Sequence, residues 1–134
     1  MSRTEQFFDT NVLLYLLSAD HAKADRAEKE LSAGGVVSVQ VINEFASVAV
    51  RKLKMSIAEI REVLNPIRAV CTIVPVSEET HDLGLHIAEK YGLSIYDAMI
   101  VASALLAECN TVISEDMQHG QTLERRLRIR NPFR

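Results

Sequence analysis

The sequence predicts an α/β fold, a three-layer α/β/α sandwich with a central parallel sheet of four to five strands. Short β-like runs alternate along the chain with longer helical stretches. Neighbouring parallel strands need long crossover connections of this kind, whereas antiparallel strands can be joined by a short hairpin. The 134 residues, 48% of them hydrophobic, are enough to bury one core, so we expect a single domain over residues 1–134.

The first half of the chain is predicted to form two strands, each followed by helix. The apolar run at Gln6–Phe8 is the first strand, and a helical pattern then runs from Val12 to a stop at Gly34. Val36–Val39 is the second strand. The apolar residues of the next helix recur with a period near 3.6, at Val41, Ile42, Phe45, Val48, Ala49 and Leu53.

The second half continues the alternation. A capping box, Ser56-Ile-Ala-Glu59, opens a helix that we expect Pro66 to kink or end. Ser94–Ala107 is apolar nearly all round, so this helix should lie deep in the structure. The remaining expected elements are strands at Cys71–Pro75, Thr111–Ile113 and Leu127–Ile129 and a helix from Ser77 to Gly92.

Composition and charge exclude several classes of protein. Only 5 Gly, 3 Pro and 2 Cys exclude a disordered chain and a disulfide scaffold, and a net charge of -3 argues against nucleic-acid binding by bulk positive charge. The N-terminus has no signal-peptide core, and the longest apolar run is about half of what a bilayer needs. We therefore expect a cytoplasmic protein without a membrane segment, whose cysteines are reduced core thiols.

Four acids are candidates for a functional site. Asp9 and Asp116 follow the first and fourth strands, where parallel sheets bind their ligands, and Glu44 and Asp97 lie near the beginnings of apolar helices. Each also has an ordinary interpretation as a helix cap or a solvated helix residue. Carboxylates gathered at one edge repel each other, and a hard cation that prefers oxygen ligands, Mg²⁺ or Mn²⁺, removes that repulsion.

Four segments resemble the motifs of the PIN-domain ribonucleases, in order and at compatible spacing. They are Phe8–Tyr15, Gln40–Phe45, Leu93–Ile100 and Ser114–Gly120. The tail, Leu127–Phe133, is similar to that of many VapC-type toxins, which are the PIN-domain members of toxin–antitoxin pairs. The resemblance therefore extends over nearly the whole chain.

The resemblance implies a PIN-like sandwich with an acidic pocket that holds one or two Mg²⁺ or Mn²⁺ ions. The acids that match the family's metal ligands are Asp9, Glu44, Asp97 and Asp116. The implied activity is endoribonuclease, the metal-assisted hydrolysis of an RNA phosphodiester with water as the nucleophile. A missing pair of catalytic histidines and a missing Gly-rich phosphate loop agree with this chemistry.

Further residues of the matched motifs have implied supporting roles. Thr10 or Asn11 would shape the first loop, and Ser114 would orient a water or a neighbouring carboxylate. Glu115 is an additional acid that could replace or supplement Asp116.

The densest basic region, near the C-terminus, is a candidate RNA contact. Its arginines are Arg125, Arg126, Arg128, Arg130 and Arg134, of which the first three are the candidate contacts, and His119 in the fourth motif could also approach the substrate. A solvated strand edge and a solvent-facing loop histidine are the alternatives. No aromatic stacking platform is evident, and we expect Tyr96 to be buried.

The resemblance also implies partners. VapC-type toxins usually form homodimers and are neutralised by a small antitoxin whose C-terminal segment occupies the acidic pocket. An antitoxin arginine would suit such a pocket. The helices between Ser56 and Tyr91 are candidates for the dimer surface.

Two other classes of function stay open at this stage. A Mg²⁺-binding phosphotransfer or phosphatase domain also uses aspartates at strand ends, but a phosphatase of this type needs a second Asp where the chain has Asn11. A receiver domain needs a lone Asp after a central strand, whereas Val74 leads to Pro75. The second class is a catalytically silent PIN-like interaction module that binds a basic partner through its acids.

Overall fold

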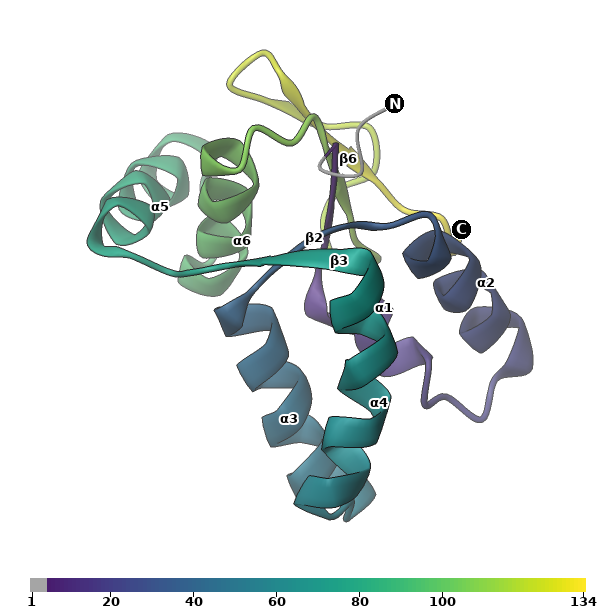
Figure 1. Cartoon of the computed structure of the whole chain (residues 1–134). Helices are drawn as coiled ribbons and strands as arrows, with labels where there is room; N and C mark the ends of the chain where they lie inside the picture. The colour runs from purple at the N-terminus through teal and green to yellow at the C-terminus, as the bar shows by residue number, and fades with distance from the viewer. Residues whose placement is uncertain (1–4) are drawn as a thin grey trace.

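The computed structural model describes residues 5–134, and its six strands form one sheet in the order β3-β2-β1-β4-β6-β5 (Figure 1). Five strands are parallel, and β5 is antiparallel to β6. Residues 1–4 lie outside the described residues. The expectation that the N-terminus has no signal-peptide core begins with these residues. The strands are β1 (Gln6–Phe8), β2 (Gly35–Ser38), β3 (Cys71–Val74), β4 (Thr111–Ile113), β5 (Thr122–Leu123) and β6 (Leu127–Arg130).

Two groups of helices cover the sheet. The chain first moves outward from β1 to β2 and β3 and then returns to β4, and right-handed crossovers in opposite directions cover opposite faces. Figure 1 shows α5 and α6 packed together, apart from the group formed by α1 to α4. This arrangement is the predicted α/β/α sandwich. The helices are α1 (Thr10–Tyr15), α2 (His21–Ser32), α3 (Val39–Leu53), α4 (Ile57–Val70), α5 (Glu78–Tyr91) and α6 (Ile95–Leu106).

The core lies where both faces of the sheet meet the helices. The central strands bury their side chains almost completely, including Phe7 and Phe8 of β1 and Val112 and Ile113 of β4. Every residue of α6 from Ala98 to Leu105 is buried, as its apolar pattern predicts. None of the helices in the described part of the chain is long and apolar enough to span a bilayer.

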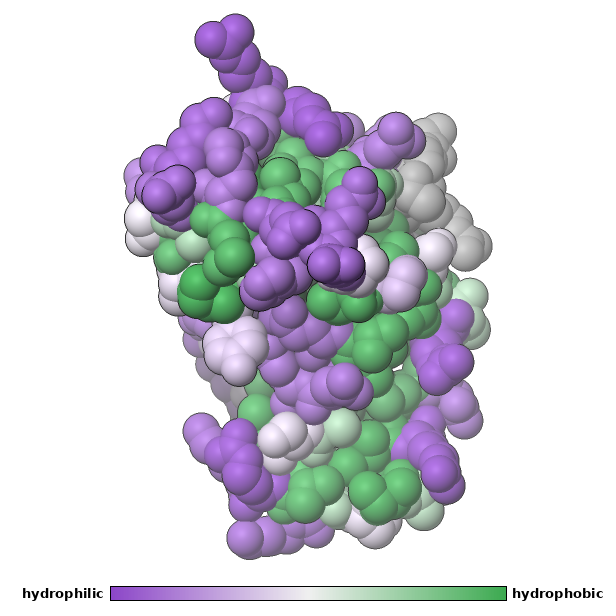
Figure 2. Space-filling view, turned by 90° about the vertical axis from the view of Figure 1, so that its left-hand side faces the viewer, coloured by the Kyte–Doolittle hydropathy of each residue, from purple (hydrophilic) through white to green (hydrophobic). Residues whose placement is uncertain are grey.

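Hydrophobic residues also reach the surface. Figure 2 shows them near the lower end of the molecule, where Figure 1 places the connection between α3 and α4. Leu53 and Ile57, on either side of this connection, are 46% and 58% exposed. Exposed apolar side chains at the tip of a helical hairpin are typical of a surface that contacts another molecule.

Three local features differ from the sequence-based expectations. The helix α4 does not end at Pro66 but continues to Val70, because Pro66 is exposed and water can satisfy the carbonyl that loses its partner. The strand β2 ends at Ser38, whose side chain caps α3. The short β5 was not expected, since Glu124 and Arg125, with φ of 50° and 61°, form its turn without glycine.

We predict that Gly35→Ala destabilises the fold more than Gly84→Ala. A Cβ at Gly35 would lie 2.6 Å from the backbone oxygen of Gln6 and 2.6 Å from the Phe8 ring, so β1 would have to move. A Cβ at Gly84 meets the flexible end of Met99 instead. The free energy of unfolding should fall by about 2–3 kcal/mol for Gly35→Ala and by about 1 kcal/mol for Gly84→Ala. Urea denaturation measures both, and equal losses would contradict the prediction.

Candidate functional site

The site begins where β1 and β4 end side by side. In their parallel register Phe8 lies opposite Ile113, and the N–H of Asp9 donates to the Ile113 carbonyl at 3.0 Å. Asp9 and Ser114 therefore leave the sheet as neighbours. The Ser114 hydroxyl donates to Asp9 Oδ2 at 2.8 Å, and both residues are buried.

Ser114 also organises the loop that follows β4. Its Oγ accepts the backbone N–H groups of Asp116 and Met117, each at 3.2 Å, while its proton goes to Asp9. One hydroxyl thus satisfies three partners. The Ser114 side chain is fully buried, and its hydrogen bonds connect the turn that carries Asp116 directly to Asp9.

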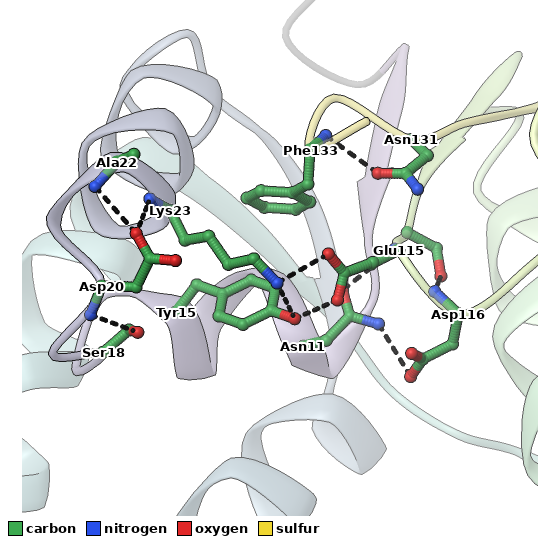
Figure 3. Close-up of polar contacts among 11 residues, drawn as sticks. Asn11, Tyr15, Ser18, Asp20, Ala22, Lys23, Glu115, Asp116, Asn131 and Phe133 are labelled. Atoms are coloured by element: carbon green, nitrogen blue, oxygen red, sulfur yellow. Dashed lines mark hydrogen bonds and ion pairs between the residues drawn. The ribbon is translucent and has the colours of Figure 1, made fainter.

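Asn11, in the first turn of α1, bridges two of the acids. Its Nδ2 donates to Asp116 Oδ2 at 3.1 Å and to Asp9 Oδ2 at 3.4 Å. Its Oδ1 accepts the backbone N–H of Glu115 at 3.3 Å. Figure 3 shows Asn11 beside the loop after β4, with its amide nitrogen directed toward the Asp116 carboxylate. The first motif therefore holds the fourth through a single amide side chain.

Thr10 connects the same loop to α3. Its backbone N–H donates to Asp9 Oδ1 at 2.7 Å, which makes Asp9 the N-cap of α1, and its hydroxyl donates to Glu44 Oε2 at 3.2 Å. The other oxygen of Glu44 accepts from Gln40 Nε2 at 2.9 Å. Gln40 also reaches the backbone oxygen of Tyr96, the residue before Asp97, at 3.5 Å. Side chains of α1 and α3 thus meet each other and the backbone of the first turn of α6 at the end of the sheet.

The electrostatics of Asp9 show that the acids affect one another. Burial raises the pKa of Asp9 from 3.8 to about 6, although the hydrogen bonds from Ser114 and from the Thr10 N–H lower it. The negative charges of Asp97 and Asp116 raise it further. Asp9 is therefore a carboxylate whose ionised form is costly in this environment.

Asp97 responds in the same way. Partial burial raises its pKa, the hydrogen bond with Ser94 lowers it, and the charges of Asp116 and Glu44 raise it. Asp97 and Asp116 thus act on the ionisation of Asp9, and Asp116 and Glu44 act on that of Asp97. This coupling places all four in one electrostatic neighbourhood.

The donor set suits a hard divalent cation. Carboxylate oxygens are the ligands that Mg²⁺ and Mn²⁺ prefer, and a cation would relieve the repulsion that raises the pKa of Asp9 and Asp97. Within residues 5–134, no group of three or more His, Cys, Asp or Glu side chains lies close enough together to hold a metal ion as arranged. The acids fit such an ion in donor chemistry and charge, and Asn11 and Thr10 are hydrogen-bonded links between them.

Glu115 does not join the acids. Its carboxylate lies with Tyr15 and Lys23: the Tyr15 hydroxyl donates to Oε1, and Lys23 Nζ lies 3.1 Å from Oε2 (Figure 3). Asp116, next in the chain, faces Asn11 instead. The interpretation of Glu115 as a replacement or supplement for Asp116 is therefore wrong, because the Glu115 side chain is directed toward Tyr15 and Lys23.

The residues expected to contact RNA lie in two different places. Arg125 and Arg126 precede β6, and Arg128 is opposite the first residue of β4, so these arginines lie toward the edge of the sheet where the parallel strands begin. The acids lie at the edge where the strands end. His119 follows β4 and is exposed, and its Nδ1 accepts the N–H of Asn131 at 3.0 Å. The structure thus does not bring the arginines to the acids.

A groove of about 810 Å³ opens beside Glu44. The predicted burial of one residue that lines it is wrong. Tyr96, which lines the groove with Gln40 and Arg51, is 70% exposed rather than buried. The buried part of α6 begins only at Ala98, because its first turn lies at the end of the sheet. The neighbours of Tyr96 in the sequence, the apolar Ile95 and the acidic Asp97, gave no clear signal of this exposure.

Comparisons with known proteins agree with this architecture. The family model of the PIN domain matches residues 7–122. Among solved structures, the chain is similar to a toxin–antitoxin complex from Klebsiella pneumoniae, with 20% identity, 96% of this chain and 98% of that chain covered, and a TM-score of 0.71. No curated protein sequence matches the chain.

Two further structures share the fold. One is VapC20 of Mycobacterium tuberculosis, a toxin that cleaves the sarcin–ricin loop, with 15% identity, 83% and 91% of the two chains covered, and a TM-score of 0.66. The other is VapBC2 from Rickettsia felis bound to a DNA fragment of its promoter, with 17% identity, coverage of 94% and 97%, and a TM-score of 0.64.

We predict that Asp9→Asn stabilises the protein at pH 7 in the presence of a chelator. The folded-state pKa of about 6 lies above the ordinary 3.8, so the folded protein loses stability as the pH rises from about 4 to 6. Removing the charge should raise the free energy of unfolding by about 1–3 kcal/mol at pH 7, and the gain should vanish below pH 4. Denaturation at a series of pH values measures it, with Asp25→Asn, exposed on α2, as the control.

Proposed function

The chain belongs to the PIN domain family, and from this premise we propose that it is a metal-dependent endoribonuclease that acts as the toxin of a toxin–antitoxin pair. The observation that carries the proposal is the electrostatic coupling of four acids at the end of the sheet. They are Asp9, Glu44, Asp97 and Asp116, the same positions that match the family's acidic motifs. An RNA substrate agrees with a cytoplasmic location.

These four acids would hold Mg²⁺ or Mn²⁺. When bound, the ion supplies activation of a water and stabilisation of the charge that develops on the phosphate. Around it, the Ser114 hydroxyl orients Asp9, and the Thr10 hydroxyl orients Glu44. Such hydrogen bonds keep each carboxylate in one conformation, so that little reorganisation is needed during the reaction.

The groove beside Glu44 is the path that we propose for the RNA strand. Tyr96 precedes Asp97 and offers an exposed ring on which a base can stack. Arg51, further along the groove, can contact a phosphate. Both residues thus line the same groove as Glu44, one of the four acids, whereas the C-terminal arginines do not.

Two findings support the toxin role: the family to which the chain belongs and the toxins among the similar structures. The Klebsiella structure is a toxin–antitoxin complex, and VapC20 is a toxin that cleaves RNA of the sarcin–ricin loop. An antitoxin that inserts an arginine among the four acids would pair with their carboxylates. A homodimer is proposed as well, and the exposed Ile57 and Leu85 lie on the helices expected to carry its surface.

We predict that the purified chain cleaves RNA only with Mg²⁺ or Mn²⁺ and that Asp9→Asn and Asp97→Asn abolish cleavage. Loss of one acid should lower the rate at least about hundredfold, because charge stabilisation in the transition state is lost. Gel electrophoresis of a structured RNA with a 5′ label measures the rate. The products should carry a 5′-phosphate if water is the nucleophile.

The matched control is Asp82→Asn, an exposed aspartate of α5 away from the acids, which should retain full activity. Circular dichroism confirms that the variants fold. Full cleavage in excess chelator, or undiminished cleavage by both site variants, contradicts the metal mechanism. Expression of the chain in cells tests the toxin role, because growth should stop with the unaltered protein and continue with Asp97→Asn.

We predict that Tyr96→Ala weakens RNA binding while Tyr96→Phe does not. Loss of one stacked base costs about 1–3 kcal/mol, so KM should rise about tenfold with kcat little changed. Steady-state cleavage of a labelled RNA measures both constants. Equal KM values for the unaltered chain and Tyr96→Ala would exclude this groove as the RNA path.

A further inference from the structure

Tyr15, Lys23 and Glu115 form a cluster on the side of the fourth-motif loop that faces away from the acids. The Tyr15 hydroxyl and Lys23 Nζ both reach the Glu115 carboxylate, and Lys23 Nζ lies 3.3 Å from the Tyr15 hydroxyl. Lys23 also lies over the Tyr15 ring, 4.7 Å from its centroid. Figure 3 shows the three side chains converging from α1, α2 and the loop after β4. We name this set the Glu115 clamp.

The Glu115 clamp acts on the residue next to it. Glu115 and Asp116 are consecutive, and their side chains diverge: Glu115 points toward Tyr15 and Lys23, and Asp116 points toward Asn11 (Figure 3). The backbone N–H of Glu115 is itself held by Asn11, whose amide also donates to Asp116. With the Glu115 side chain anchored on one side, the backbone presents Asp116 to the acids on the other.

The C-terminal segment supports the clamp from a third direction. The Tyr15 ring packs edge-to-face on Phe133, with ring centroids 4.8 Å apart. The Phe133 N–H donates to Asn131 Oδ1, and the Asn131 N–H donates to His119 in the same loop. Tyr15 is thus held between a lysine and a phenylalanine and cannot easily release Glu115.

The charges of the clamp also serve the site. An unpaired carboxylate at position 115 would add negative charge beside Asp116. The Tyr15 hydroxyl instead donates to Glu115 Oε1, and Lys23 Nζ lies 3.1 Å from Oε2, so this charge is paired within the clamp. The loop therefore carries two adjacent acids with separate roles.

We propose that Tyr15, Lys23 and Glu115 are positioning residues that hold the Ser114–Asp116 turn so that Asp116 can serve as a metal ligand. This inference rests on the proposed function, because it assigns a role toward the cation of that site. None of the three residues contacts the acids directly through its side chain in the described contacts, so they act through the loop backbone.

The test measures Mn²⁺ binding directly, by the electron paramagnetic resonance signal of free Mn²⁺, together with cleavage at increasing Mn²⁺. Tyr15→Phe removes the hydroxyl but keeps the ring on Phe133 and the net charge, and it should raise the Mn²⁺ dissociation constant about tenfold. Lys23→Met should do the same. Cleavage should recover at saturating Mn²⁺ in both variants. Lys23→Arg should restore the affinity to within about twofold of the unaltered chain.

The sign of the Lys23→Met effect separates positioning from simple electrostatics. Removing a positive charge near the acids would by itself strengthen the attraction for Mn²⁺. A weaker affinity therefore has to come from the displaced loop. Lys90→Met is the matched control, because Lys90 pairs with Glu124 at similar exposure (50% and 24%, against 37% and 25% for Lys23 and Glu115). It should leave the Mn²⁺ affinity unchanged.

Two results would overturn the inference, and they are distinguishable. If the unaltered chain binds Mn²⁺ but Tyr15→Phe and Lys23→Met bind it equally well, with only the melting temperature lowered, the clamp is purely structural and the proposed function stands. If the unaltered chain neither binds Mn²⁺ nor cleaves RNA, the proposed function fails and the inference fails with it.

Discussion

The parallel pairing of β1 with β4 is the constraint on which the site depends. It aligns the ends of two strands that are more than 100 residues apart in the sequence, and the N–H of Asp9 and the Ser114 hydroxyl complete the junction. Because Asp9 also caps α1, the first helical turn begins at this junction. Thr10 and Asn11 therefore extend toward the acids of α3 and of the loop after β4. One register thus sets the positions of most of the site.

The junction has an energetic cost, which lies in charge rather than in unsatisfied hydrogen bonds. Among the described residues, the only buried side-chain oxygen or nitrogen without a partner is Ser103 Oγ, in the middle of α6. Asp9 is fully hydrogen-bonded, yet burial and neighbouring acids still raise its pKa to about 6. The apolar strands, with Phe7 and Phe8 beneath the site, offset that cost. Stability is thus reduced at a position that the proposed function requires, as is common for active sites.

Local sequence patterns predicted the architecture and the place of Asp9 and Asp116 directly after strands, because both depend on short-range features. Hydrophobic periods located the helices and strands, and strand ends located Asp9 and Asp116. The direction of Glu115 could not be predicted, because its partner Lys23 is 92 residues away. The exposure of Tyr96 and the path of α4 through Pro66 depend on where a helix meets solvent. No residue pattern along the chain encodes that information.

The net charge of -3 is a sum over acidic and basic residues that lie in different parts of the structure. The acids gather where the parallel strands end, and Arg125 and Arg126 lie where they begin, so these two arginines are remote from a phosphate at the acids. Under the proposed function, attraction for RNA at that end of the sheet would come from a bound cation and from Arg51 in the adjacent groove. In the proposed nuclease, the bound cation would therefore be the main attraction for the RNA phosphates. The affinity for RNA should then depend on how fully the cation occupies the site of the acids rather than on the net charge of the chain.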